Sequence, residues 1–360
     1  MTSFSSRITI GNNTDTETSA GLKFYGTVKY SGQLQPADDY ILNGDIFGGW
    51  FKYKPDAKML RTGYRTYDAK PVSEGGEGGA YVFKKQFTVK YMNPEAMGGG
   101  IWQTKQVLYG DTITVESTAG WSKYLLKSWN LNGKTVYAYD SIVVTDNLTF
   151  TPNCVIAQAR IGGTYYEYLQ DAVNAADNKD TINLVSDCGS AVTIAGKTLT
   201  INLNNCTISG NNGYGMLNVR EGAKLTVNGP GTIKNSNKSN TACAIYVDKN
   251  ELIVNGCTLE GNSGIVTNPK ETSTVKASSC KITGTGLNGI GTGKKSGKGF
   301  ITLELINCVI VGAQAGIDLS GYEAGGKVDI KGGSIKGKDG DDDVAIIFGV
   351  AMSVVITGVA

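Results

Sequence analysis

A repeat of about 25 residues between Leu199 and Ala360 constrains the fold of this chain more than any other feature. Each unit has an apolar strand pattern, a polar residue, a small or turn residue, and a further apolar run. The small residue recurs at positions 206, 231, 257, 280, 308, 333 and 359, at steps of 25, 26, 23, 28, 25 and 26 residues. A fixed period of this length indicates one supersecondary unit stacked on copies of itself. Because the units are rich in strand formers, Gly and Asn, the repeat predicts a parallel β-solenoid.

The composition agrees with short strands joined by tight turns. The 360 residues include 49 Gly and only 7 Pro, and the formal net charge is +2. We therefore expect an all-β protein with a right-handed parallel β-helix of about seven coils, preceded by small β-rich modules. The low net charge gives no reason to expect binding to nucleic acid.

One helix is predicted just before the solenoid, over residues 164–177. Thr164 and Glu167 have the spacing of a capping box, in which each side chain binds a backbone N–H of the first turn. Apolar residues then follow at helical spacing, at Tyr165, Tyr168, Leu169, Ala172, Val173 and Ala176. Such a helix is expected to cover the open apolar end of the first coil.

The segment from this helix into the first repeat resembles a known family. Residues 168–173, 180–185 and 196–201 are similar to the entry cap and first coil of pectate-lyase-like right-handed β-helices. The resemblance covers residues 160–360 and implies a fold. It implies little about activity, because this fold hosts lyases, hydrolases, adhesins and phage spikes.

Residues 81–153 form a second unit with its own resemblance. A strand, a Gly turn, a Tyr-Gly-Asp-Thr run, Trp129 and the hairpin signal Asn132-Gly133 follow one another in the order seen in the Listeria–Bacteroides repeat. This is a small β-grasp-like module of bacterial surface proteins. The usual Gly-Trp pair is here Ser128-Trp129, and the terminal aromatic-Trp is missing. The resemblance implies a spacer or a binding unit, so the predicted domains are 1–80 (a β-rich attachment region), 81–153 and 154–360.

No constellation of residues predicts catalysis. The chain contains no His, and the Arg patterns of pectate lyases are absent. Glycoside hydrolysis needs two carboxylates that face one groove. The solenoid carboxylates Asp248, Glu251, Glu260 and Glu304 occur about one per coil, so solvated surface is the favoured interpretation. We predict no catalytic residue and no cofactor.

One acidic cluster, Asp339-Gly-Asp-Asp-Asp343, is a weak metal candidate. Asp339, Asp341 and Asp343 have the alternation of a calcium loop. However, Val344 replaces the Gly that an EF-hand requires at its sixth position, and the downstream Glu is missing. A solvated turn is therefore favoured over a specific calcium site.

Four of the seven cysteines lie on one rung of the repeat, at positions 206, 257, 280 and 308. Neighbouring coils of a parallel solenoid lie about 4.8 Å apart, so these thiols are expected to stack inside it. Because the chain has no CxxC pair and no His, we expect small buried hydrophobes and no metal or redox site. Free buried thiols indicate folding in a reducing cytosol.

Residues 344–360 carry no charge, which raises the alternative of a membrane span. Val354 and Ile356 instead keep the register of Val328 and Ile330, so this segment is predicted to be the last coil, with no membrane span. An open coil exposes strand edges and apolar side chains. We therefore expect a homo-oligomer, with a trimer favoured, through the interface residues Ile346, Ile347, Phe348, Val350, Met352, Val354, Ile356 and Val359.

Surface-type modules, free thiols and an N-terminal sequence without a recognisable secretion signal together suggest a virion protein made in a host cytoplasm. We expect a non-enzymatic phage structural protein: a capsid decoration protein, a head fibre or a tail spike. Residues 1–80 would attach it to capsid or tail proteins, and it would bind cell-surface polysaccharide. The alternatives are a bacterial surface adhesin or glycan-binding protein, and a polysaccharide lyase or hydrolase.

Overall fold

The computed structural model describes residues 29–30, 49–51, 54–55, 57–68, 80–117, 120–293, 295–337, 344–349 and 352–358. The chain divides into two compact units, Met1–Ala119 with Leu126–Cys154 and Gly120–Leu125 with Val155–Ala360. Most of the expected attachment region lies outside the described residues. So do the metal candidates Asp339, Asp341 and Asp343 and the expected interface residues Val350 and Val359.

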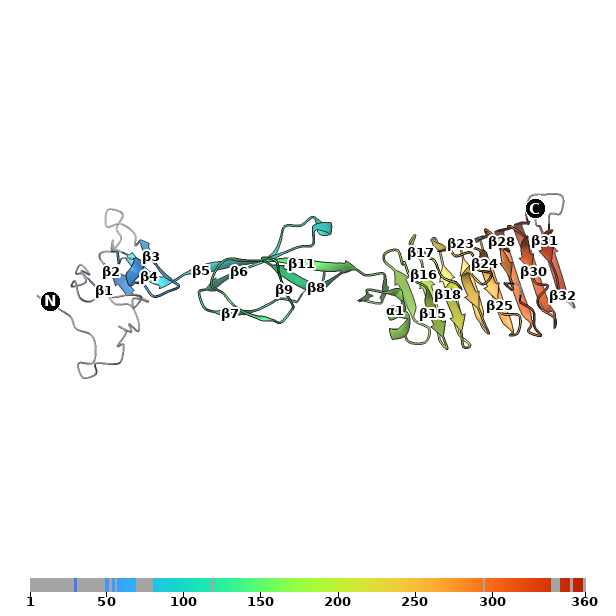
Figure 1. Cartoon of the computed structure of the whole chain (residues 1–360), viewed down its shortest axis with the longest axis horizontal. Helices are drawn as coiled ribbons and strands as arrows, with labels where there is room; N and C mark the ends of the chain where they lie inside the picture. The colour runs from blue at the N-terminus through green and yellow to red at the C-terminus, as the bar shows by residue number, and fades with distance from the viewer. Residues whose placement is uncertain are drawn as a thin grey trace, which may run out of the picture. The chain divides into compact units, whose positions relative to one another are not determined.

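The second unit contains a right-handed parallel β-solenoid of about six turns, slightly fewer than the predicted seven. Each full coil has three strand segments, as in β16 (Thr198–Asn202), β17 (Thr207–Gly210) and β18 (Gly215–Arg220) (Figure 1). The next coil repeats this order in β19 (Lys224–Asn228), β20 (Thr232–Asn235) and β21 (Cys243–Val247).

The later coils follow the same order, except that β28 and β30 each run as one strand through the first and second segments. They are formed by β22 (Glu251–Asn255), β23 (Thr258–Gly261), β24 (Ser263–Thr267), β25 (Ser273–Ser278), β26 (Lys281–Gly284), β27 (Ile290–Gly291), β28 (Ile301–Gly312), β29 (Ala315–Asp318), β30 (Gly326–Lys336), β31 (Val344–Ile347) and β32 (Met352–Thr357). The third segments of the coils join β15 (Val192–Ala195) in a seven-stranded sheet, and the first and second segments belong to a 14-stranded sheet.

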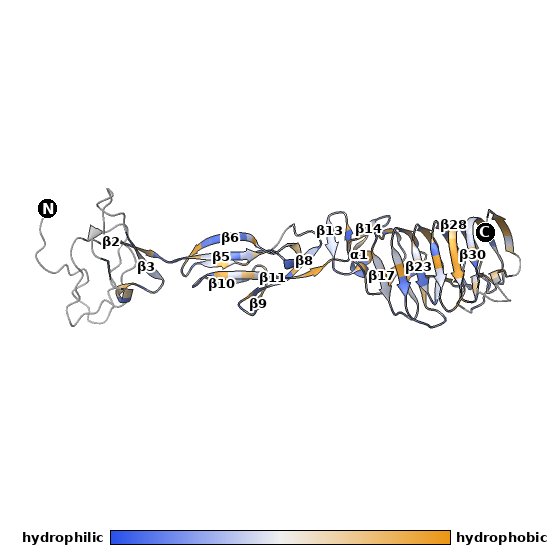
Figure 2. Ribbon diagram, turned by 90° about the horizontal axis from the view of Figure 1, so that it is seen from above, coloured by the Kyte–Doolittle hydropathy of each residue, from blue (hydrophilic) through white to orange (hydrophobic). Residues whose placement is uncertain are grey.

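Apolar residues at equivalent positions stack along the inside of the solenoid. Leu199 pairs with Leu225, which pairs with Leu252, and all three are buried. The stack continues to the last coil, where Val354 pairs with Val328 and Ile356 with Ile330. Figure 2 shows hydrophobic and hydrophilic residues mixed along these strands, as the alternation of inward and outward side chains requires. Each buried aliphatic side chain stabilises the fold by roughly 1.5–3 kcal/mol.

A left-handed residue turns the chain from the first segment of a coil to the second. Gly256 has φ 64°, and Ser279, Asn307 and Gly332 at equivalent positions have φ 51°, 50° and 67°. Gly and Asn adopt this conformation at low cost. This corner explains the turn residue of the sequence repeat. The small residue that follows it, such as Cys257, directly precedes the second segment.

A ladder of side-chain hydrogen bonds runs next to this corner. Each side chain donates to the residue one coil earlier: Asn202 to Asn183 (2.9 Å), Asn228 to Asn202 (3.0 Å), Asn255 to Asn228 (3.0 Å) and Ser278 to Asn255 (2.8 Å). All five side chains are partly buried. A hydrogen bond of this kind contributes about 1 kcal/mol, so the ladder ties the first coils together in addition to the backbone.

The predicted helix over 164–177 is wrong in its first part. Thr164 lies in β13 (Thr164–Tyr166), which pairs antiparallel with β12 (Ala159–Ile161). Gly162, with φ 53°, makes the turn between them. The capping box does not form, because Thr164 lies in the second strand of this hairpin and Glu167 directly follows that strand. A Gly-Gly pair between two short β runs is a hairpin signal, and here it overrides the helical spacing.

The helix that does form, α1 (Leu169–Ala175), has seven residues. Its N-cap, Tyr168, makes no side-chain cap bond; instead, the Leu169 N–H donates to Gln158 Oε1 (3.0 Å). At the other end, Lys197 Nζ donates to the Ala176 carbonyl (2.7 Å), as a cation near a helix C-terminus should. Leu169, Ala172 and Val173 are buried in the solenoid core, so α1 packs against the first coil.

The first unit contains a five-stranded sheet of β6 (Ile101–Leu108), β5 (Gln86–Met92), β11 (Leu148–Ile156), β8 (Tyr124–Leu131) and β9 (Lys134–Val136), in that order. The predicted Asn132-Gly133 hairpin joins β8 to β9, with both residues at positive φ. The rings of Tyr91 and Phe150 stack at 4.6 Å, and Trp129 meets Tyr91 edge-on at 5.1 Å. This aromatic cluster forms the core of the unit.

Two smaller sheets complete the first unit. The ribbon of β7 (Thr112–Thr114) and β10 (Ser141–Val143) is antiparallel. A four-stranded sheet has the order β1 (Lys29–Tyr30), β2 (Gly49–Phe51), β4 (Ala80–Lys84) and β3 (Tyr64–Asp68).

Stacking inside the solenoid leaves no room for a side chain at Gly289. A Cβ there would lie 2.5 Å from Ile310 Cγ2 and 2.6 Å from the Gly316 carbonyl oxygen. Gly289→Ala is therefore expected to lower the free energy of unfolding by about 1–3 kcal/mol in denaturant titrations, a typical cost of overpacking. Gly189→Ala is the control, because nothing lies within 4 Å of its Cβ position. Equal stability of the two variants would contradict the packing argument.

Candidate binding surfaces

Two tyrosines and an arginine form a cluster on the outer face of the seven-stranded sheet. The Arg220 guanidinium carbon lies 5.6 Å from the centre of the Tyr214 ring and 5.4 Å from that of Tyr246. The two rings meet edge-on at 5.9 Å. Lys295 Nζ lies 6.0 Å from the Tyr246 ring. Cations at these distances from aromatic faces are attracted to them, so the cluster holds two positive charges beside two rings.

Strand alternation explains why Tyr246 points outward. Its neighbour Ile245 stacks inside the solenoid between Leu217 and Ile265. Tyr246 therefore lies on the opposite face, where it forms a small separate hydrophobic cluster with Cys243 and Val266. Tyr246 is 5% exposed, whereas Tyr214 is 47% exposed. The site thus has one ring in its floor and one at its rim.

A long connection between β20 and β21 fixes the position of the rim. Asn235 replaces the Gly found at equivalent ends of β17 and β23. It is buried, and its amide donates to the carbonyls of Tyr214 (2.6 Å) and Cys243 (3.0 Å). Thr241 Oγ1 donates to the Gly213 carbonyl at 2.7 Å. These bonds hold the segment that carries Tyr214.

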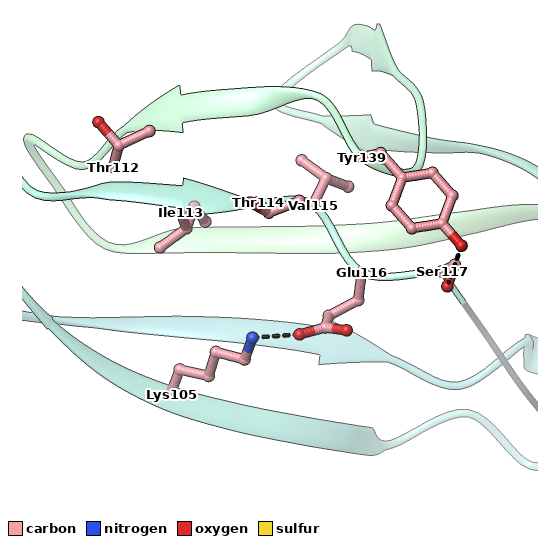
Figure 3. Close-up of a pocket in the computed structure, with 8 residues that line it drawn as sticks. All are labelled: Lys105, Thr112, Ile113, Thr114, Val115, Glu116, Ser117 and Tyr139. Carbon is pink, nitrogen blue, oxygen red and sulfur yellow. Dashed lines mark hydrogen bonds and ion pairs between the residues drawn. The ribbon is translucent and has the colours of Figure 1, made fainter.

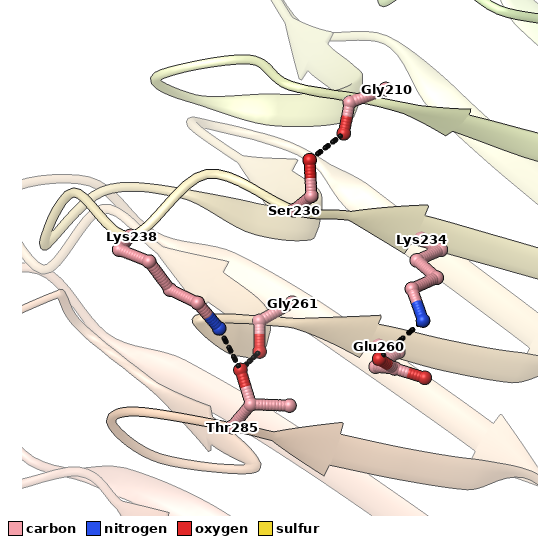
Figure 4. Close-up of polar contacts among 7 residues, drawn as sticks. All are labelled: Gly210, Lys234, Ser236, Lys238, Glu260, Gly261 and Thr285. Carbon is pink, nitrogen blue, oxygen red and sulfur yellow. Dashed lines mark hydrogen bonds and ion pairs between the residues drawn. The ribbon is translucent and has the colours of Figure 1, made fainter.

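The same connection is also anchored to the neighbouring coils (Figure 4). Ser236 Oγ donates to the carbonyl of Gly210 (3.0 Å), and Lys238 Nζ donates to Thr285 Oγ1 (2.9 Å). Thr285 Oγ1 in turn donates to the carbonyl of Gly261 at 3.0 Å. The segment beside the aromatic cluster is therefore pinned to the coils before and after it, so the cluster is preorganised.

The guanidinium of Arg220 keeps its donors available. It makes no hydrogen bond or ion pair with any residue that the structure describes, and it is only partly buried. Asp248 is the acidic residue next to Arg220 on the neighbouring strand, because Val247, which precedes it, pairs with Val219. The Asp248 Oδ1 accepts a hydrogen bond from Asn268 (2.6 Å). Burial, followed by the nearby Asp248 charge, raises the pKa of Tyr246 to about 12, so its hydroxyl stays protonated at neutral pH.

This arrangement suits a ligand that carries both an apolar ring face and an anionic group. A guanidinium with free donors binds a carboxylate through two parallel hydrogen bonds. The exposed Tyr214 ring offers a surface for stacking. An acidic sugar combines these two features. Sequence reasoning did not identify these residues, since they lie at unequal spacings on different coils.

The solenoid carboxylates do not converge on a groove. Glu251 pairs with Lys224 (3.0 Å), Glu260 with Lys234 (2.8 Å; Figure 4) and Glu304 with Lys276 (3.1 Å). Each pair joins outward side chains of neighbouring coils. Such partly exposed pairs stabilise a fold only weakly. In the described residues, no group of three or more His, Cys, Asp or Glu side chains could hold a metal ion.

All seven cysteines are free, and three of the four cysteines on the predicted rung are buried, whereas Cys206 is only partly buried. Cys257, Cys280 and Cys308 are each about 2% exposed in the core, and Cys206 packs against it. Burial raises the pKa of Cys188 and Cys257 to about 12. A shared side-chain hydrogen bond raises the pKa of Cys280 and lowers that of Cys308. Burial thus keeps the Cys188 and Cys257 thiols protonated at neutral pH, where they act as small apolar side chains.

The last coil places the expected interface residues at an open edge. Among the strands that the structure describes, β32 pairs only with β30, and β31 pairs only with β29. Val354 and Ile356, which continue the inner stack, are 37% and 45% exposed. Ile346, Ile347 and Met352 are partly buried, and Phe348 is exposed. Within the part of the chain that the structure describes, no helix is both long enough and apolar enough to span a membrane.

The first unit contains a pocket of about 390 Å³ (Figure 3). Its lining consists of Lys105, Thr112, Ile113, Thr114, Val115, Glu116, Ser117 and Tyr139. Lys105 and Glu116 form an ion pair inside it, and the Tyr139 hydroxyl donates to Ser117 Oγ at 3.0 Å. No feature of the sequence pointed to this pocket.

Comparisons with known proteins identify no relative. No protein-family model matches the chain, and neither a curated protein nor a solved structure matches it.

The buried thiols make solenoid stability sensitive to alkaline pH. The folded pKa of Cys257 is raised above its ordinary value of 9, so its contribution is present below pH 9 and is lost as the pH rises toward 12. We expect Cys257→Ala to lose less free energy of unfolding between pH 9 and 11 than the parent chain. Cys206→Ala, at a less buried thiol, is the control. Identical pH profiles for the parent and Cys257→Ala would contradict this assignment.

Proposed function

We propose that this chain is a non-enzymatic structural protein of a phage particle whose solenoid binds an acidic saccharide. It would serve as a capsid decoration protein, a head fibre or a tail spike. The observation that carries the binding proposal is Arg220, which lies beside two tyrosine rings with its donors unused. Displayed on a particle, this surface would recognise acidic polysaccharide on a host cell.

The thiols and the solenoid support the particle assignment. Seven free cysteines suit a protein that folds in a reducing cytosol, as virion proteins do. A parallel solenoid presents long, regular outer faces on which loops can build a binding surface. The resemblances to pectate-lyase-like β-helices and to the Listeria–Bacteroides repeat belong to this proposal, with the first unit as a spacer. Residues 1–80 would attach the chain to capsid or tail proteins.

A bacterial surface adhesin is the second candidate, and the same aromatic and cationic cluster favours it. The two candidates differ in location. Antibody labelling of purified particles and of intact cells in electron micrographs distinguishes them. Label on the particles supports the first candidate, and label confined to the cell surface supports the second.

The saccharide site is tested by calorimetric titration of the full chain with polygalacturonate, using dextran as a neutral control. Arg220→Ala is expected to weaken binding at least about tenfold, because it removes a charge-assisted contact. Arg220→Lys keeps the charge without the planar fork and should retain part of the affinity. The matched control Arg160→Ala, at an exposed arginine of the same unit, should bind like the parent. Equal binding by Arg220→Ala would overturn this site.

Self-association through the last coil is the remaining part of the proposal. Light scattering is expected to show a trimer for the intact chain and a monomer for a chain that stops at Asp343. Ile356→Lys places a charge at the exposed end of the inner stack and should have the same effect. Val309→Lys, at an exposed apolar residue of an inner coil, is the control and should leave the trimer intact. A monomer in every case would contradict the interface.

A further inference from the structure

We propose that the pocket of the first unit is a second saccharide site, which takes a single neutral pyranose ring. It is independent of the acidic-saccharide surface on the solenoid. All of its lining residues belong to the first unit, and none of them takes part in the proposed function above.

The size and lining of the pocket fit one sugar ring. A volume of about 390 Å³ lies at the small end of the range for ligand pockets. Four side chains of the lining carry hydroxyl groups: Thr112, Thr114, Ser117 and Tyr139. A hydroxyl both donates and accepts a hydrogen bond, so this lining matches the hydroxyl groups around a sugar. Ile113 and Val115 also belong to the lining, and both are buried.

The charges in the pocket favour a neutral ligand. Lys105 and Glu116 are the two charged residues of the lining, and they form an ion pair with each other. An ionic group on a sugar would therefore have to compete with this ion pair for Lys105 or Glu116. Both side chains are only about one-third exposed, at 34% and 29%. The ammonium still has further donors and the carboxylate further acceptor sites, which adjacent sugar hydroxyls can use.

Tyr139 supplies a wall for the ring. It is 73% exposed, yet it is held in place: its hydroxyl donates to Ser117 Oγ (3.0 Å) and its N–H donates to the Val115 carbonyl (2.8 Å). Its backbone has φ 72°, a conformation that is uncommon and costly for a bulky residue. Strained residues of this kind cluster at binding sites, where the surrounding structure maintains them. A fixed, exposed aromatic face is suited to stacking on a sugar ring.

A reporter lies directly behind the pocket. The indole N–H of Trp129 donates to the Glu116 carbonyl at 2.8 Å, and Trp129 is fully buried. A ligand that contacts Glu116 is expected to change the environment of this indole. Trp129 thus provides an optical signal in addition to direct measurements.

The test titrates the full chain with glucose, galactose, mannose and N-acetylglucosamine, followed by saturation-transfer NMR and tryptophan fluorescence. Glucuronate and glucosamine are the charged comparisons. We expect saturable binding of at least one neutral sugar and weaker binding of its charged analogue. Tyr139→Ala should weaken binding at least about fivefold through the loss of stacking. Tyr137→Ala, at a tyrosine that is 59% exposed on the same connection but outside the pocket, should bind like the parent.

Two results would overturn the proposal. One is the absence of saturable binding for all four neutral sugars, and the other is equal binding by the Tyr139→Ala and Tyr137→Ala variants. Glu116→Gln gives a second readout, because it should weaken the neutral sugar without unfolding the unit, as judged by its circular dichroism. Arg220→Ala should leave neutral-sugar binding unchanged, so failure of this site and failure of the solenoid site are distinguishable.

Discussion

The in-register stacking of apolar side chains inside the solenoid is the constraint on which the rest of this structure depends. Leu225 meets Leu199 on one side and Leu252 on the other, and the same holds at each inner position. A coil cannot bury its apolar face alone, so its stability comes from its neighbours. The register fixes the residue types only at the inner positions, so the outer faces and the connections can vary in sequence. The candidate binding surface is formed by residues at these variable positions. At the start of the connection between β20 and β21, Asn235 bonds the backbone of Tyr214 and Cys243 where β17 and β23 end in Gly.

The regular part of the fold could be predicted from the sequence because it repeats. The period revealed the coils, and the alignment of Val354 with Val328 correctly placed the last one. The helix before the solenoid was predicted too long, because the spacing of Tyr165 and Leu169 satisfies a helix as well as a strand followed by a helix. The Gly162-Gly163 hairpin decided between them: it pairs β13 with β12, and β12 in turn pairs with β14 of the solenoid sheet.

The candidate sites could not be predicted for a related reason. Tyr214, Arg220 and Tyr246 come from two coils and a connection, and they meet only because β18 and β21 pair in a particular register. The pocket of the first unit depends on Tyr139 at positive φ, which no local pattern requires. A sequence repeat shows which positions carry similar residues in every coil. A binding site is formed by residues that differ from one coil to the next, so the repeat does not point to them. The expected metal candidates Asp339, Asp341 and Asp343 stay a prediction, since they lie outside the described residues.

The asparagine ladder has a direction and an end. Every amide in it donates toward the first coil, and the series stops at Ser278, because Ile306 and Lys331 occupy the next equivalent positions. The hydrogen bonds of this ladder therefore join only the earlier coils of the solenoid. Coils up to β25 carry this ladder, whereas later coils are joined by other side-chain contacts, such as Lys276 with Glu304 (3.1 Å) and Asn288 with Asp318 (3.2 Å). Local opening that starts at the last coil would therefore meet the first bond of the asparagine ladder only at Ser278.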